Sequence, residues 1–341
     1  MKVVSFGEIL LRLATPGYTR LFQQNSLETS FCGGEANVAV SLSNFGLNSV
    51  FVTKLPENDV GYAAVNTMRY FGVDTSKVIY GSGRMGLYYL EKGASQRASR
   101  IIYDRAYSAI TLAKKQDFNW ENIFADADWF HWSGINPALG DNIVEICLQA
   151  CRAAKKLGLT VSCDLNYRKN LWSSEKANAV MSQLMNYVDV CIGNEEDAEK
   201  VLGIKAPNSD IEAGLLNKNG YEYVAEKISR EFGCNYVAFT LRQSHSASDN
   251  GWSAMIYDRV NEEIHFSKEY QVHIVDRVGS GDSFTAGLIY GLITGQISKD
   301  AVEFAAAASC LKHSIEGDFN RVSVEEVMDL LNGSGNGRIK R

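Results

Sequence analysis

The stretch Asp276-Arg-Val-Gly-Ser-Gly-Asp-Ser-Phe-Thr-Ala-Gly287 is the most informative part of the sequence. Its glycines Gly279 and Gly281 precede a helical pattern that begins near Asp282. Backbone N–H groups at the start of a helix have no intrahelical partner and carry partial positive charge, so such a turn can hold an anion. An aspartate there could accept a proton from a hydroxyl group while the amides stabilise a phosphoryl group. The alternative is an ordinary glycine turn with an aspartate that caps a helix.

A second glycine motif lies near the N-terminus, in the stretch Cys32-Gly-Gly-Glu-Ala-Asn-Val-Ala-Val40. Its two glycines run directly into a helical pattern that contains Asn37. Because glycine has no side chain, it lets the backbone approach a ligand closely or hinge a flap. The sequence contains no GxxxxGK[ST] string, and no GxGxxG string follows its first apolar run. A P-loop and a dinucleotide-binding oxidoreductase are therefore both disfavoured.

Between the two motifs, apolar runs of strand length alternate with longer amphipathic stretches. Buried strands that alternate with helices predict an α/β fold, with a mostly parallel sheet covered by helices on both faces. The predicted strands cover residues 3–6, 49–54, 129–133, 160–164, 188–192 and 236–241. The predicted helices cover residues 35–44, 62–71, 142–157, 176–187, 195–202, 221–232, 283–294, 300–314 and 324–331.

Two stretches interrupt this alternation, at residues 12–30 and 84–104. Both have the pattern of strands and turns with exposed polar residues. Neither is long enough to form a domain alone, so we expect them to pair into a small sheet over one end of the main layer. Such a sheet could close as a lid over a reaction that must exclude water. We therefore expect residues 1–331 to form one domain and residues 332–341 a flexible tail.

The composition is that of an ordinary globular protein of 341 residues, of which 45% are apolar, with a net charge of −6. Since no broad basic field is present, nucleic acid is not an expected partner. No segment approaches the roughly 20 apolar residues of a membrane span, so we expect no membrane contact and a cytoplasmic location. The seven cysteines include no CxxC pair, which argues against a disulfide framework or a zinc site. Cys147 and Cys151 are expected to pack on one face of a helix.

Together, the two glycine motifs resemble those of the ribokinase-like (PfkB) carbohydrate kinases. That family has G-G-x-x-N near the N-terminus and D-T-x-G-A-G-D late in the chain. Here Arg277 stands where Thr is usual, and Ser280 where Ala is usual. The resemblance implies a Rossmann-like three-layer αβα sandwich with a small β lid, and phosphorylation of a sugar hydroxyl with ATP and Mg²⁺. It further implies that Asp282 is the general base and that Gly279, Ser280 and Gly281 form the anion hole.

The same resemblance assigns residues that hold the magnesium-bound phosphates. Asn194 and Asp197, in the stretch Cys191-Ile-Gly-Asn-Glu-Glu-Asp197, stand where the family has N-x-x-E and would act on the metal indirectly. Because aspartate is one methylene shorter than glutamate, Glu195 or Glu196 could share this role. An acidic first turn of a helix is the alternative interpretation.

Three residues match the nucleotide side of the family's site. Thr240, at the end of a predicted strand, and Arg242 just after it would lie beside the nucleotide. His313 would lie near the adenine or, alternatively, cap a helix. The family also implies that a monovalent cation could be held near Asp276.

The predicted substrate is an acid sugar. Family members that act on neutral sugars place an aspartate soon after the first strand, but here no aspartate precedes Asp59. Arg12 stands in that place, either as a surface residue or toward an anionic substrate. The planar fork of donors on arginine matches a carboxylate. The stretches Gly86-Leu-Tyr88, Ile102-Tyr-Asp-Arg105 and Asp164-Leu-Asn-Tyr-Arg168 resemble those of 2-keto-3-deoxygluconate kinases, which phosphorylate the 6-hydroxyl of that acid sugar. The substrate contacts that this resemblance implies are Gly34, Asn37, Tyr88, Tyr103, Arg105, Ile135 and Arg168.

Several alternatives stay open. Arg168 could instead form a structural ion pair with Asp164. The substrate could be a neutral ketohexose, as in fructokinases, or a phosphorylated sugar, because arginine also binds phosphate. A non-catalytic sugar or nucleotide sensor would be expected to lose the acidic base, whereas Asp282 is present. Exposed edges of a small lid are often covered by a second copy, so we expect a homodimer or larger homo-oligomer.

Overall fold

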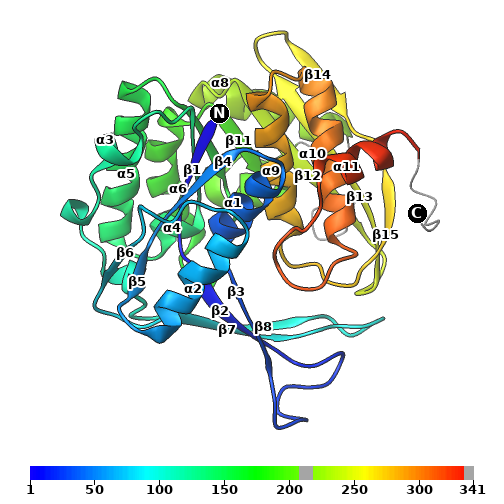
Figure 1. Cartoon of the computed structure of the whole chain (residues 1–341). Coiled ribbons are helices and arrows are strands. Elements are labelled where there is room, and N and C mark those ends of the chain that lie inside the picture. Colours follow the sequence, from blue (N-terminus) through cyan, green and yellow to red (C-terminus); the bar gives the residue numbers. More distant parts are fainter. Residues whose placement is uncertain (207–217, 334–341) are drawn as a thin grey trace.

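Six parallel strands form the centre of the molecule (Figure 1). They are β1 (Lys2–Phe6), β4 (Asn48–Val52), β9 (Trp129–Ser133), β10 (Thr160–Asp164), β11 (Val190–Gly193) and β12 (Tyr236–Ser244). The structure is a computed structural model that describes residues 1–206 and 218–333. Within the sheet, β1 lies between β4 and β9, and β10, β11 and β12 follow in order beyond β9. The carboxyl ends of all six strands therefore meet at one edge, where open α/β sheets bind their ligands.

Three antiparallel strands extend this sheet beyond β12, and the sequence pattern did not predict them. They are β13 (Asp249–Asp258), β14 (Glu263–Phe266) and β15 (Tyr270–His273). The strand β13 pairs with β12 along its whole length and then carries both β14 and β15. Because β13 supplies hydrogen-bond partners beyond residue 241, β12 continues to Ser244. The prediction that Thr240 ends its strand was therefore wrong.

Helices cover both faces of the sheet, and each face has its own apolar core. Alternate strand residues point to opposite cores: Val4 and Phe130 to one, and Val3 and Trp129 to the other. The predicted α/β class, with helices on both faces, is confirmed. The helices on the first face are α3 (Trp120–Ile123), α5 (Asp141–Lys156), α6 (Ser174–Leu184), α7 (Glu195–Leu202) and α8 (Lys218–Phe232). Those on the second are α1 (Gly34–Asn44), α9 (Ser280–Ile293), α10 (Ser298–Lys312) and α11 (Val324–Leu331).

The remaining elements are short or peripheral. The helix α2 (Asp59–Tyr70) packs with α1 in a third, smaller core, and α4 (Ile135–Ala138) follows β9. Two short strands, β5 (Lys54–Pro56) and β6 (Ile79–Gly81), form a separate pair, and three 3₁₀ turns cover Ala109–Leu112, Lys115–Asp117 and Met185–Tyr187. No helix in the described part of the chain is both long and apolar enough to span a membrane. The predicted tail falls mostly on residues 334–341, which lie outside the described residues.

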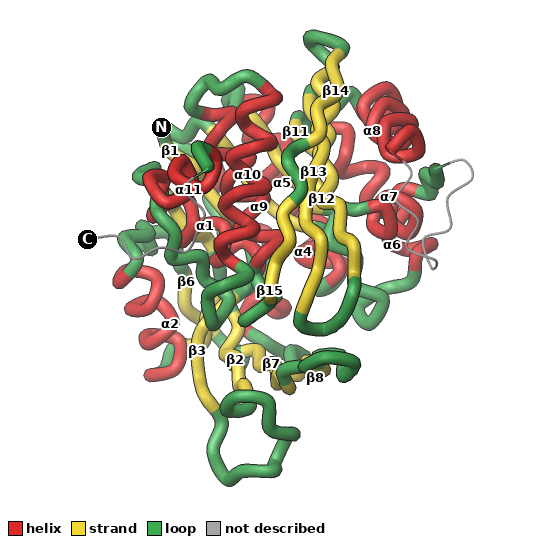
Figure 2. Tube along the Cα trace, turned by 90° about the vertical axis from the view of Figure 1, so that its right-hand side faces the viewer, coloured by secondary structure: helices red, strands yellow, loops and turns green. Residues whose placement is uncertain are grey.

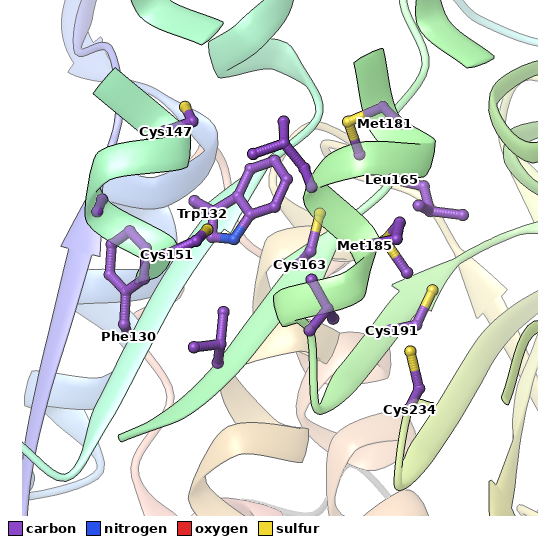
Figure 3. Close-up of a cluster of buried hydrophobic side chains, with 14 of the residues drawn as sticks. Phe130, Trp132, Cys147, Cys151, Cys163, Leu165, Met181, Met185, Cys191 and Cys234 are labelled. Atoms are coloured by element: carbon purple, nitrogen blue, oxygen red, sulfur yellow. The ribbon is translucent and has the colours of Figure 1, made fainter. Parts of the chain in front are cut away.

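The cysteines pack as small apolar side chains. Figure 3 shows Cys147 and Cys151 on α5 beside Trp132, in the core that also holds Cys163 and Cys191. All seven cysteines are free thiols. Burial raises the pKa of the Cys147 and Cys151 thiols, so both stay protonated and unreactive. The prediction that this pair serves packing is confirmed.

A second sheet of four strands follows directly from the carboxyl end of β1 (Figure 2). Its strands are β2 (Leu10–Ala14), β3 (Glu28–Cys32), β7 (Gly86–Glu91) and β8 (Arg100–Asp104), in the order β3-β2-β7-β8. The predicted separate small sheet is thus present, although β2 begins two residues earlier than expected. Because β3 ends at Cys32, the sheet leads straight into the first glycine motif and α1.

Arg12, on β2, joins this small sheet to the turn that precedes α9. Its guanidinium is 3% exposed; it donates to Oδ2 of Asp276 at 2.6 Å and also to Asp318. Burial alone would lower the pKa of Arg12, but the two carboxylates outweigh this and raise it. Arg12 is therefore neither a surface residue nor free to face a substrate, and both expectations for it were wrong.

We predict that Arg12→Ala lowers the free energy of unfolding by about 3–5 kcal/mol, because it leaves Asp276 and Asp318 buried without their partner. The measurement is equilibrium denaturant unfolding near neutral pH. Arg84→Ala is the matched control, since Arg84, just before β7, pairs with Asp104 of β8, and both side chains are more than one-third exposed. The control should cost about 1 kcal/mol or less. Equal losses in the two variants would contradict the role of Arg12.

Candidate active site

The start of α9 has the conformation that the glycine motif predicts. Gly279 is the N-cap residue, in the left-handed region with φ 83°. A Cβ atom at Gly279 would lie 2.0 Å from the carbonyl oxygen of Asp318, so both the backbone angle and the space require glycine. At Gly281, by contrast, a Cβ atom would meet nothing within 4 Å. The backbone is therefore open to an approaching group at Gly281.

The first amides of α9 are available to bind an anion. Within the described chain, the amides of Gly281 and Asp282 have no hydrogen-bond acceptor. Ser280 differs, because its side chain is buried and its hydroxyl donates to the carbonyl oxygen of Arg277 at 2.9 Å. The amide of Ser280 donates to the same carbonyl oxygen at 3.4 Å, so Ser280 holds the turn, and the amides of Gly281 and Asp282 are the ones available to an anion.

The two glycine motifs meet at Asp282. Asn37, on α1, donates from Nδ2 to Oδ2 of Asp282 at 2.6 Å. A Cβ atom at Gly34 would lie 3.6 Å from Oδ1 of the same carboxylate, so this glycine also faces Asp282. Burial raises the pKa of Asp282 to about 6, while the hydrogen bond from Asn37 opposes the shift. The result is a carboxylate that is mostly ionised at neutral pH yet basic enough to take a proton.

Glu35 is a second carboxylate at the site, and the sequence interpretation gave it no role. Its side chain is 2% exposed and accepts a hydrogen bond from the hydroxyl of Ser133. A Cβ atom at Gly7 would lie 2.0 Å from Oε2 of Glu35, so glycine at position 7 makes room for this carboxyl group. Burial raises the pKa of Glu35 to about 7. An acidic residue inside an otherwise apolar helical start was the signal that could have identified it.

Asp164 and Asp197 bring two further acids to the carboxyl ends of β10 and β11. Burial, and then the charges of Asp197 and Asp282, raise the pKa of Asp164 well above its ordinary value. The expected alternative of an ion pair between Asp164 and Arg168 is wrong. Arg168 is exposed, and its Nη1 donates to the carbonyl oxygen of Tyr167 at 3.0 Å.

Asn194 and Asp197 form a capping box at the start of α7. The side chain of Asn194 accepts from the amide of Asp197 at 2.9 Å, and Asp197 accepts from the amide of Asn194 at 3.2 Å. The other oxygen of Asp197 accepts from the amide of Tyr167 at 2.8 Å. Burial raises the pKa of Asp197 to about 6. Both side chains thus hold the backbone in place.

The other acids of this turn have different surroundings. Glu196 is exposed and lines the cleft described below, whereas the side chain of Glu195 lies outside what the structure describes. Among the described residues, no three His, Cys, Asp or Glu side chains are grouped to hold a metal ion directly.

A cleft of about 930 Å³ lies between β8, α4 and the loop that follows β10. Tyr103, Arg105 and Arg168 line it, as do Glu196 and Lys169. Arg105 has its Nη2 atom 2.7 Å from Oε2 of Glu8, and its guanidinium lies 5.0 Å from the ring centre of Tyr103. The structure therefore brings three of the predicted substrate contacts into one cavity. Of the two arginines, Arg105 already has an internal carboxylate partner.

Tyr88 and Ile135, two further predicted substrate contacts, are not among the residues that line this cleft. The hydroxyl of Tyr88 donates to the carboxylate of Asp318 at 2.7 Å, and its ring is 5.8 Å from that of Tyr103. Tyr88 is buried beside Arg12, which occupies the register position opposite it on β2. The amide of Ile135 donates to the hydroxyl of Ser133 at 3.2 Å.

Two of the residues expected on the nucleotide side, Arg242 and His313, both lie against the ring of Trp252. Thr240 is half-buried within β12, and Arg242 lies two residues further along the strand, its guanidinium 5.4 Å from the ring centre of Trp252. His313 is buried and is the C-cap residue that follows α10, with its Nδ1 donating to the carbonyl oxygen of Ser309 at 2.8 Å. Burial lowers the pKa of His313 to about 4, so its ring is neutral. The capping role expected as the alternative for His313 is therefore present.

Comparison with known proteins places these features in a family. The model described as "pfkB family carbohydrate kinase" matches residues 1–225 and 247–320. A curated relative from Haloferax volcanii, "2-dehydro-3-deoxygalactonokinase", is 31% identical, with 98% of each chain covered. Another from Bacillus subtilis, "2-dehydro-3-deoxygluconokinase", is 25% identical over 96% of this chain and 94% of its own.

Solved structures agree with these sequence matches. The crystal structure of a 2-dehydro-3-deoxygluconokinase from Thermotoga maritima is 51% identical, with a TM-score of 0.94, and the match covers 98% of this chain and all of that one. A PfkB family carbohydrate kinase from Listeria grayi is 32% identical, with a TM-score of 0.90, and the match covers 97% of this chain and 100% of the other. The chain therefore belongs to the pfkB carbohydrate kinase family and is an ATP-dependent carbohydrate kinase.

Proposed function

We propose that this enzyme transfers the terminal phosphoryl group of ATP to the 6-hydroxyl of 2-keto-3-deoxygluconate, with Asp282 as the general base. The observation that carries the proposal is the contact of Asn37 with Asp282 at the open N-terminus of α9. The names of the relatives from Bacillus subtilis and Thermotoga maritima support the sugar.

In the proposed mechanism, Asp282 accepts the proton of the attacking hydroxyl while the amides at the start of α9 stabilise the charge on the phosphoryl oxygens. Asn37 keeps the carboxylate aimed at the hydroxyl. Magnesium bound to the nucleotide would neutralise phosphate charge beside Asp164 and Asp197, with Asn194 and Asp197 acting on it only through water or the phosphates. Thr240 and Arg242 would flank the nucleotide. Closure of the small sheet would exclude water from the reaction.

Arg168 is the proposed contact for the carboxylate of the sugar. Arg168 lies exposed in the cleft. Within the described chain, its one hydrogen bond runs from Nη1 to the backbone carbonyl oxygen of Tyr167. The planar fork of the guanidinium therefore keeps further donors for a bidentate contact. Arg105, which is paired with Glu8, would instead orient Tyr103 and the cleft wall. Gly34, Tyr88 and Ile135 complete the proposed substrate side.

A second candidate substrate is the C4 epimer, 2-keto-3-deoxygalactonate, because the Haloferax volcanii relative carries the name of that activity. Both sugars present the same carboxylate and the same terminal hydroxyl, so the geometry at Asp282 and Arg168 serves either. A cytoplasmic location, a homodimer and the single-domain organisation of residues 1–331 stay predictions.

The first test is Asp282→Asn, which should lower kcat by roughly 10²–10⁴-fold and change the KM for the sugar little, because the amide cannot accept the proton. Steady-state kinetics with ATP and the acid sugar measure both constants. Asp300→Asn is the matched control, since Asp300 lies in the first turn of α10 as Asp282 does in α9, but is exposed. Near-normal turnover of Asp282→Asn would exclude this base.

We predict that kcat/KM falls as the pH drops through about 6, because Asp282 must be ionised to accept a proton and its pKa is raised to that value.

The raised pKa of Asp282 also affects the stability of the fold. A carboxyl group with a raised folded-state pKa stabilises the fold while it is protonated, and this contribution is lost as the pH rises through about 6. Asp282→Asn should therefore gain stability relative to the wild type between about pH 4 and pH 7. A gain that does not change with pH would contradict the raised pKa.

The substrate proposal predicts that Arg168→Ala raises the KM for 2-keto-3-deoxygluconate roughly 10–100-fold, in line with the loss of a charge-assisted bidentate contact. The KM for a neutral ketohexose should change little. Coupled assays of ATP consumption over both acid-sugar epimers, fructose and phosphorylated sugars give the comparison. Arg100→Ala, an exposed arginine on β8 outside the cleft lining, is the control. Equal effects on acid and neutral sugars would refute the carboxylate contact, and turnover of only a neutral or phosphorylated sugar would refute the substrate class.

A further inference from the structure

Lys312, the last residue of α10, is a fully buried lysine. Its side chain has 0% relative exposure, and its Nζ donates to the carbonyl oxygen of Ile315 at 3.1 Å and to that of Asp276 at 3.4 Å. Lysine is almost never buried so completely unless it is paired. The ammonium group therefore lies in a built pocket of backbone oxygens beside the turn that leads to Asp282.

The charges around Lys312 balance. Asp276 and Asp318 are both buried, and Arg12 donates to both. With Lys312 charged, the cluster holds two cations and two carboxylates and is neutral. Burial lowers the pKa of Lys312, while Asp276 and then Asp318 raise it. Removing the ammonium charge would leave the cluster with an excess buried negative charge, which is costly.

The backbone around this cluster forms the anion turn. The carboxylate of Asp276 accepts from the amide of Val278 at 3.1 Å and from the amide of Gly317 at 3.2 Å. The carbonyl oxygen of Asp318 lies against Gly279, the N-cap residue of α9. One turn earlier on α10, Ser309 donates to the carbonyl oxygen of Ser280 at 2.7 Å. Lys312 thus connects α10 to both backbone segments that fix the position of the first amides of α9.

The residues near Asp276 do not fit a monovalent metal ion, which the family resemblance implies for this region. Such an ion needs carbonyl and carboxylate oxygens that are free to coordinate it. Here two carbonyl oxygens already accept from the ammonium of Lys312. A second cation among the same oxygens would be repelled by Lys312 and Arg12, and would leave the buried cluster with a net positive charge.

We propose that the ammonium of Lys312 replaces a monovalent metal ion as a permanent cation that positions the 276–282 turn. Lys312 is a positioning residue, because it acts through the backbone of Asp276 and Ile315 and does not touch the reacting groups. The enzyme then requires neither K⁺ nor Na⁺ for turnover. This inference rests on the proposed role of the turn as the anion site, but not on the identity of the sugar.

The first experiment uses the wild-type enzyme with ATP, Mg²⁺ and the acid sugar in K⁺, Na⁺ or tetramethylammonium salts at equal ionic strength. We expect kcat to agree within roughly twofold among the three salts, which is a small difference in barrier height. The melting temperature should also be the same in each. A several-fold stimulation by K⁺ or Na⁺ over tetramethylammonium would overturn the proposal.

The second experiment uses Lys312→Ala, which opens the oxygen pocket and removes the charge. In tetramethylammonium salt we expect kcat to fall roughly 100-fold, as for a misplaced catalytic group. In K⁺ salt, kcat should recover in part and the melting temperature should rise with K⁺ concentration, because the metal ion can enter the vacated pocket. Lys299→Ala, an exposed lysine on the same helix, should match the wild type. Full activity of Lys312→Ala without K⁺, or loss of activity that K⁺ rescues in neither kcat nor melting temperature, would overturn the proposal.

Two further readouts separate this inference from the proposed function. If the acid sugar is not the substrate, no salt gives turnover, but the melting temperatures and their shifts on addition of ATP still report on Lys312. If Lys312→Ala does not fold, the salt comparison on the wild-type enzyme decides by itself. Equal ATP-induced shifts of the wild type in all three salts support the proposal, and a shift that requires K⁺ contradicts it.

Discussion

The hydrogen bond from Asn37 to Asp282 is the constraint on which the site depends. It joins the first turns of α1 and α9, two helices that lie far apart in the sequence and pack against each other on the same face of the sheet. Burial alone would favour the protonated carboxyl group, whereas the amide donor favours the carboxylate and fixes its direction. Because the side chain of Asn37 controls both the charge and the direction of the carboxylate, the relative position of the two helices decides whether Asp282 can act as the proposed base.

Around this contact, the protein gathers charged groups that would ordinarily avoid burial. Glu35, Asp164 and Asp197 all have raised pKa values near Asp282, and two buried cations, Arg12 and Lys312, lie beneath the turn. Such groups reduce stability unless each is paired or hydrogen-bonded. Their concentration at one edge of the sheet is typical of a functional site, where electrostatics is arranged for a ligand that brings its own charge. The apolar cores on either side supply the stability that this arrangement needs.

The parts of the structure that the sequence predicted are those with a local signal. The strands of the parallel sheet and the helices that cover it were predicted from the spacing of apolar residues and from glycines at helix ends. The turn at the start of α9 was predicted from Gly279 and Gly281. The antiparallel strands β13 to β15 were missed because β13 pairs with β12, and β14 and β15 in turn pair with β13, and no local pattern reveals this pairing. Glu35, Arg12 and Lys312 were missed or misplaced for a similar reason. A charged residue in a sequence is ordinarily exposed, and only the fold brings these three to buried partners.

The link from Arg12 to Asp276 also has a thermodynamic consequence for the two ligands. One end of this ion pair belongs to the small sheet, whose strand β8 borders the proposed sugar cleft, and the other belongs to the turn that would receive the phosphates. Any ligand that changes the position of the small sheet must therefore also change the free energy of the 276–282 turn. By reciprocity, occupancy of the turn must change the affinity of the cleft by the same factor. Sugar and nucleotide would then bind with mutual cooperativity, carried by one guanidinium group.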